Sequence, residues 1–131
     1  MSKYADIIAR LEKAEDFDRD LDRDIGIVLM GWRYEEVEGF GQMIYIPDEN
    51  AYYPDHPGSL TPSITSSIDA AVALVERMLP DQAILLGYGQ DALTKPWARI
   101  SVPCGSSHGA TLPLAILRAL FRALDAQEAS E

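Results

Sequence analysis

The chain has few of the residue types that most reactive centres need. Its 131 residues include one cysteine, Cys104, and two histidines, His56 and His108. A single thiol cannot form an internal disulfide, and two imidazoles and one thiol spread this widely make a poor metal site. We therefore expect no disulfide, no metal and no cofactor.

Positive charge is also scarce. There are 11 Lys and Arg residues against 21 Asp and Glu residues, which gives a formal net charge of −10 at pH 7. A phosphate backbone is bound by clustered cations that release counterions, so this balance argues against direct nucleic-acid binding. Such a net charge ordinarily serves solubility, and the alternative is a basic protein partner for the acidic first half of the chain.

Long apolar runs are absent as well. The longest, such as Ala70 to Val75, fall far short of the ~20 residues that cross a bilayer. The first residues, Met-Ser-Lys-Tyr, lack the apolar core of a secretory signal. We expect a cytoplasmic protein without membrane association. Residues 1–131 are expected to form one domain, because this length and the 47% hydrophobic content suffice for a single core.

Helical signals are abundant. Ser66 and Asp69 have the spacing of a capping box, and the helix that follows should stop before Pro80. The buried face of this helix is expected to comprise Ile68, Ala71, Val72, Val75 and Leu79. Three further helices are predicted: residues 4–14, a helix that starts after Asp16 or Asp18 and ends at Gly31, and residues 112–124 after the N-cap Thr111.

Four short strands complete the pattern. Residues 33–37 and 42–46 are typical of a hairpin, and residues 83–88 and 97–102 of a second strand pair. Between Pro47 and Pro62, four prolines indicate a long exposed connection. The predicted fold class is α+β, in the order α-α-β-β-α-β-β-α. Its small antiparallel or mixed four-stranded sheet would be flanked by helices as a sandwich.

The closing helix is apolar around most of its circumference. Pro113, Arg118 and Arg122 are the only residues between Leu112 and Leu124 that are not apolar. A helix of this kind is buried on more than one side, either between layers of its own domain or against a second copy. A homodimer through this helix is therefore one expectation.

A loop of small residues at 103–111 is the candidate ligand or reactive site. Its candidate residues are Cys104, Gly105, Ser106 and His108. Small residues leave backbone amides open to an anion, and the thiol and imidazole are the groups of a nucleophile and its base, with Asp91 or Asp69 to orient them. Neither a Walker lysine nor a complete glycine-rich fingerprint is present. We favour a plain loop between a strand and a helix, with a small buried cysteine.

Two acidic stretches form the candidate interaction surface. Its residues are Asp16, Asp18, Asp20, Asp22, Glu36 and Glu38. The alternating aspartates fail as a calcium loop in three registers, because Gly is missing from position 6 and Glu from position 12. We favour a helix start in which Arg19 and Arg23 partly compensate the acids. The two glutamates would share one face of a solvated hairpin.

Four aromatic residues are candidates for a binding surface, namely Trp32, Tyr45, Tyr52 and Tyr53. Tyrosine and tryptophan are favoured at interfaces because one end of the side chain is apolar and the other polar. At this spacing, some of the four must belong to the core.

Three segments together resemble a known family. They are TSSIDAAVALV from Thr65 to Val75, WARI from Trp97 to Ile100, and GATLPLAILRAL from Gly109 to Leu120. These segments resemble the phage ABA sandwich domain family of phage and prophage proteins, and LDRDI followed by Gly31-Trp32 is similar to its first helix. The resemblance implies helices flanking a sheet and a bacterial host cell. It brings no catalytic or ligand residues.

The sequence thus predicts a small acidic phage-type protein that acts as a non-enzymatic binding module. One alternative is an acidic mimic of nucleic acid that inhibits a host nuclease or defence protein. Another is a small-ligand or hydrolytic site around Cys104 and His108.

Overall fold

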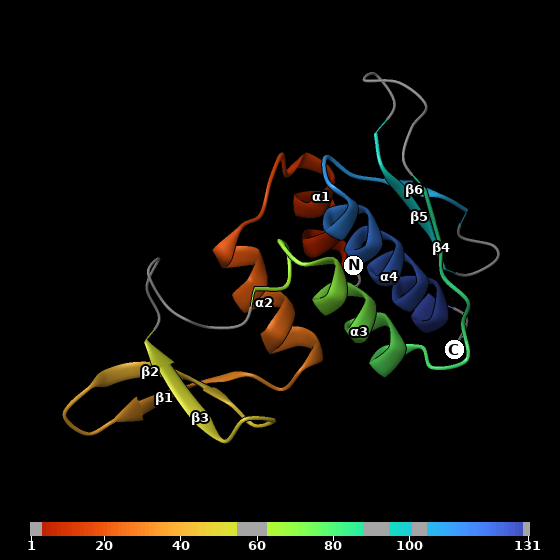
Figure 1. Ribbon diagram of the computed structural model, residues 1–131. Coiled ribbons are helices and arrows are strands. Elements are labelled where there is room, and N and C mark those ends of the chain that lie inside the picture. The colour runs from red at the N-terminus through yellow and green to blue at the C-terminus, as the bar shows by residue number, and fades with distance from the viewer. Residues whose placement is uncertain (1–3, 55–62, 88–94, 101–104, 130–131) are drawn as a thin grey trace. The chain divides into compact units, whose positions relative to one another are not determined.

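A computed structural model describes residues 4–54, 63–87, 95–100 and 105–129. These residues form four helices and two three-stranded antiparallel sheets, with helices packed against strands (Figure 1), which confirms the α+β class. The chain divides into two compact units, Met1–Asp18 with Ile64–Glu131 (unit 1) and Arg19–Ser63 (unit 2).

Unit 1 is built around the closing helix α4 (Leu112–Ala129). The helices α1 (Ala5–Lys13) and α3 (Ile68–Met78) pack against it, and so do strands β5 (Trp97–Arg99) and β6 (Ser107–His108). Figure 1 shows α4 between the two helices and the sheet. The fully buried side chains of α4 include Leu114, Ile116, Leu117, Leu120 and Phe121.

Elements of the same chain therefore bury the apolar side chains around α4. Its neighbours in unit 1 cover several sides of the helix, and Tyr4 adds an edge-to-face contact with Phe121 at 5.6 Å between ring centroids. The start of the helix agrees with the prediction, since the Leu114 amide donates to Thr111 Oγ1 over 3.5 Å. The helix extends beyond the predicted end at Leu124, to Ala129.

The start of α3 corrects the predicted capping box. Ser67, not Ser66, is the N-cap: its backbone is extended and its hydroxyl accepts from the Ala70 amide over 3.1 Å. Two adjacent serines offer the same hydroxyl, so the cap alone leaves the register open by one residue. The buried face includes the predicted Ala71, Val75 and Leu79 together with Leu74, whereas Ile68 is exposed. The helix ends at Met78, before Pro80, as predicted.

The strands form two sheets of three, whereas the sequence predicted four strands in one sheet. The order is β1-β2-β3 in unit 2 and β4-β5-β6 in unit 1, and all pairs are antiparallel. The bounds are β1 Arg33–Val37, β2 Gly41–Ile46, β3 Ala51–Pro54, β4 Leu85–Gly87, β5 Trp97–Arg99 and β6 Ser107–His108.

The two strands that the prediction missed lie in segments rich in turn-forming residues. Strand β3 lies inside the predicted connection from Pro47 to Pro62, of which residues 55–62 are outside the described part of the chain. Strand β6 has two residues in the predicted loop before α4. Strands this short have too few residues for a visible period-2 alternation.

Unit 2 begins with helix α2 (Arg19–Leu29) and continues into the β1-β2-β3 sheet. Gly31 has φ +76°, the left-handed conformation predicted for the residue that ends this helix. Across that turn, the Trp32 amide donates to the Gly26 carbonyl over 3.1 Å. The indole then lies so close to Gly26 that an added Cβ would be 2.2 Å from Trp32 Cδ2. Trp32 is only 2% exposed and is therefore a core residue.

Candidate functional site

The predicted Cys104 and His108 site stays a prediction, because the structure describes only some of its residues. Cys104 and Asp91 lie outside the described part of the chain. His108 is exposed on β6, and Asp69 is exposed in the first turn of α3. Gly105 has φ +68°, a left-handed conformation that suits a tight loop.

Two arginines of α4 hold the loop that contains Ser106 and His108. Arg122 Nη1 donates to the Ser106 carbonyl over 3.3 Å and to Ser107 Oγ over 2.6 Å. Arg118 Nη1 donates to the His108 carbonyl over 3.1 Å, and its other terminal nitrogen lies 3.5 Å from a carboxylate oxygen of Glu12. These contacts tie residues 106–108 to α4.

The acidic run is partly neutralised within α2. Arg19 pairs with Asp22 at 3.2 Å, and Arg23 pairs with Asp20 at 3.3 Å and with Asp24 at 3.1 Å. Asp22 is fully buried. Asp16 and Asp18 precede the helix, and Asp16 accepts from the Phe17 amide over 2.8 Å. This geometry agrees with the predicted helix start, with Asp18 immediately before the first helical residue.

The Asp18 backbone also ties two distant parts of unit 1 together. Its amide donates to Thr65 Oγ1 over 2.8 Å, and the Thr65 hydroxyl lies 3.3 Å from the Asp18 carbonyl oxygen, to which it donates. Thr65 is buried. The two points between which unit 2 is inserted are therefore in direct contact.

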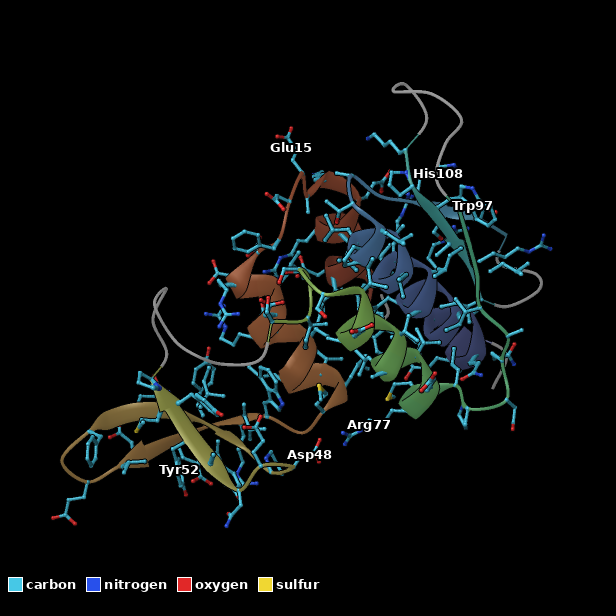
Figure 2. The ribbon with its side chains drawn as sticks, in the orientation of Figure 1. Glu15, Asp48, Tyr52, Arg77, Trp97 and His108 are labelled. Carbon is cyan, nitrogen blue, oxygen red and sulfur yellow. The ribbon has the colours of Figure 1, made fainter. Side chains whose placement is uncertain are left out.

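Ordered polar and aromatic side chains gather on one face of the β1-β2-β3 sheet. Arg33, Tyr45 and Tyr52 are paired in register across the three strands, and Glu35 lies two residues along β1 on the same face. We call these four residues the tyrosine face. Figure 2 shows Tyr52 on this sheet.

Every member of the tyrosine face contacts another member. Arg33 Nε donates to Glu35 Oε1 over 2.7 Å, and the Tyr52 hydroxyl donates to Glu35 Oε2 over 2.8 Å. The two tyrosine rings pack at 4.9 Å between centroids, and the Arg33 guanidinium carbon lies 4.5 Å from the Tyr45 ring centroid. The Tyr45 hydroxyl donates to Asn50 Oδ1 over 2.7 Å. Each side chain is thus held in place by at least two contacts.

The pKa values of these groups follow from the same contacts. The hydrogen bond from Tyr52, and then that from Arg33, lowers the pKa of Glu35. The same bond to Glu35 raises the pKa of Tyr52, and Glu35 also raises the pKa of Arg33. At neutral pH the face therefore carries the Glu35 carboxylate, the Arg33 guanidinium and the neutral Tyr52 phenol.

Of the four aromatic candidates, the structure places Tyr45 and Tyr52 together and separates the others. Tyr53 points to the opposite face of the sheet, where its hydroxyl donates to Glu49 over 2.5 Å, a bond that raises the Tyr53 pKa. Glu36 is exposed on that opposite face of β1, and Glu38 is exposed in the hairpin turn. The sequence interpretation did not predict the pairing of Arg33 with Glu35. Arg33 and Glu35 are two residues apart in β1 and therefore point to the same face of the sheet as Tyr45. This spacing is the sequence signal that could have identified them.

Other kinds of site and known proteins add no further assignment. Among the described residues, no group of three His, Cys, Asp or Glu side chains is placed to hold a metal ion. None of the helices in the described part of the chain has the length and apolar character needed to cross a membrane. No family model, curated protein or solved structure matches the chain.

Proposed function

We propose that the protein is a non-enzymatic binding module that uses the tyrosine face to bind a basic segment of a partner protein. The observation that carries the proposal is the ordered Arg33, Glu35, Tyr45 and Tyr52 network on an accessible sheet face. Tyr52 is 46% exposed although its hydroxyl and ring are both held. Because these side chains are ordered beforehand, binding costs less conformational entropy than it would for mobile side chains.

Two further properties support this partner chemistry. Tyrosine and arginine are enriched among the residues that dominate protein interfaces. Between residues 33 and 54 there are five Asp and Glu residues against one Arg, so a segment that contains lysine or arginine is steered towards the sheet as a whole, while on the tyrosine face itself Glu35 is paired with Arg33. The resemblance to phage sandwich domains makes the cytoplasm of a bacterial host the setting that we propose.

An acidic mimic of nucleic acid is the alternative function. The ion pairs of Arg19 and Arg23 with Asp20, Asp22 and Asp24 reduce the charge that such a surface presents. The alternatives are separable, because a mimic depends on carboxylates such as Glu36 and Glu38, whereas a tyrosine face depends on aromatic contact. A site at Cys104 would instead be revealed by loss of function in Cys104→Ala.

The test is binding of a panel of basic peptides, measured by NMR chemical-shift changes on the folded chain. We expect shifts at the tyrosine face and a loss of binding of about 5-fold or more in Tyr52→Ala, which corresponds to about 1 kcal/mol at an interface residue. Tyr34→Ala is the matched control, because Tyr34 is a similarly exposed tyrosine on the opposite face of the same sheet. Equal losses in both variants, or shifts confined to Glu36 and Glu38, would contradict the proposal.

A further inference from the structure

The face of the β4-β5-β6 sheet that points away from α4 carries a tryptophan that lies flat against the sheet. Ala98 of β5 is fully buried, and its neighbour Trp97 points to the opposite face. Trp97 is paired with Gly87 on β4 and with His108 on β6; Figure 2 labels Trp97 and His108. A Cβ added at Gly87 would lie 2.3 Å from Trp97 Cε2, so the indole lies directly over Gly87.

The indole is half-buried. Because the Gly87 backbone covers one side of the ring, the accessible part belongs to the opposite side and the ring edges. Exposed His108 lies beside it, and Leu85, which is 56% exposed, lies on the same face two residues from Gly87. The result is an accessible aromatic surface on this sheet.

Two cations accompany this indole. Arg99 follows Trp97 by two residues on the same strand face, and Lys95 precedes Trp97 by two residues; both are exposed. Neither makes an ion pair or a side-chain hydrogen bond with any residue that the structure describes. Arg10 and Arg118 of the same unit, in contrast, pair with carboxylates.

Negative charge is nearly absent from this part of the chain. Residues 82–124 contain one acid, Asp91, against four Lys and Arg residues; Lys95 and Arg99 accompany Trp97, whereas Arg118 and Arg122 belong to α4 on the other side of the sheet. The net charge of −10, which disfavours nucleic-acid binding for the chain taken as a whole, therefore comes from other segments. Phosphate groups respond most strongly to charges within a Debye length, about 8 Å at physiological salt.

We propose that this sheet face binds a single strand of nucleic acid, with one base stacked on Trp97 and backbone phosphates contacted by Lys95 and Arg99. An exposed aromatic ring next to cations is the combination by which proteins bind single strands without sequence preference, since every base has a π-face that can stack. The bases of a single strand are free to stack on an exposed ring, whereas a duplex keeps its bases stacked on each other. This activity is separate from the partner binding proposed for unit 2.

The intrinsic fluorescence of the chain provides a direct probe. Trp32 and Trp97 are its two tryptophans, and Trp32 is buried in unit 2. We expect an oligothymidylate of about eight nucleotides to quench the emission of Trp97 at low salt. With a labelled oligonucleotide, Trp97→Leu should weaken binding roughly 5- to 100-fold, while Trp97→Phe, which retains an aromatic ring, should keep most of the affinity.

The cations are tested by the salt dependence of the same binding. Two phosphate contacts predict a slope of about −1.4 for log K against log salt, and Arg99→Gln should reduce the magnitude of that slope by about 0.7. Lys13→Gln is the matched control: it removes one exposed positive charge at the end of α1 and should leave the slope unchanged.

Several outcomes would overturn the proposal. They are absence of binding at low salt, equal binding of wild type and Trp97→Leu, equal slopes for Arg99→Gln and the wild type, and equal affinity for duplex DNA. Equal binding of a glutamate-rich peptide would assign the face to an acidic protein instead. Arg99→Gln changes an exposed side chain, so it tests the proposal even if Trp97→Leu does not fold. Tyr52→Ala should leave oligonucleotide binding intact, which keeps this proposal separate from that for the tyrosine face.

Discussion

At the scale of single residues, the carboxylate of Glu35 is the group whose ionisation depends most clearly on its neighbours. The Tyr52 hydroxyl and the Arg33 guanidinium both donate to it, and both lower its pKa. Its folded-state pKa is thus below its unfolded value. The contribution to stability is present above the unfolded pKa and is lost as the pH falls through the lowered folded pKa.

We expect Tyr52→Phe to raise the pKa of Glu35 towards the ordinary glutamate value, because the hydrogen bond that lowers it most is removed. The measurement is an NMR titration of side-chain carboxyl carbons between about pH 2 and pH 7. Tyr53→Phe is the control, since it removes a phenol that donates to Glu49 on the opposite face. An unchanged Glu35 titration in Tyr52→Phe would show that the bond is absent in solution.

At the scale of elements, the passage from α2 into β1 depends on a glycine. Gly26 lies in the last turns of α2, where alanine would ordinarily be favoured by up to ~1 kcal/mol. Here the added methyl would lie 2.2 Å from ring atoms of Trp32, which is a large and buried side chain. We expect Gly26→Ala to lower the free energy of unfolding by about 1–3 kcal/mol, measured by urea denaturation.

The same substitution in a Trp32→Leu background isolates the cause. A smaller side chain at position 32 leaves space for the methyl group, so Gly26→Ala should then cost less or become stabilising. Equal costs in both backgrounds would mean that helix geometry, and not the indole, requires glycine at this position.

The helices could be predicted from the sequence, whereas two of the short strands could not. Long periodic helices are predictable because capping residues and apolar spacing are local: Thr111, Gly31 and the stop before Pro80 are confirmed. The strands β3 and β6 are stabilised by pairing with distant partners, and their short sequences carry no period. The tyrosine face depends on the register of three strands, which brings Arg33 and Tyr52 together across 19 positions of sequence. The division into two sheets was not predicted, because it too depends on which distant strands pair.

At the scale of the whole molecule, unit 1 is discontinuous in sequence but has its own core. Its segments, Met1–Asp18 and Ile64–Glu131, meet where Asp18 and Thr65 exchange two hydrogen bonds. The single domain expected from the chain length stays a prediction. It can be tested by replacing residues 19–63 with a short Gly-Ser linker.

We expect this shortened chain to remain folded, because α4 is packed by elements that all belong to unit 1. The helical circular dichroism signal and a cooperative thermal transition are the measurements. Thr65→Val in the shortened chain is a useful comparison, since it removes the hydroxyl that joins the two segments and should lower stability by about 1 kcal/mol. Loss of cooperative unfolding in the shortened chain would show that both units form one domain.

The contact between Asp18 and Thr65 has an evolutionary consequence. Joining two positions that already touch adds little to the entropy of closing a loop, and each doubling of loop length costs only about 0.6 kcal/mol. A lineage can therefore exchange the stretch between these positions for a shorter, longer or unrelated one while the rest of the chain keeps its structure. Recombination at this junction would let unit 2, which carries the tyrosine face, diverge in sequence independently of unit 1.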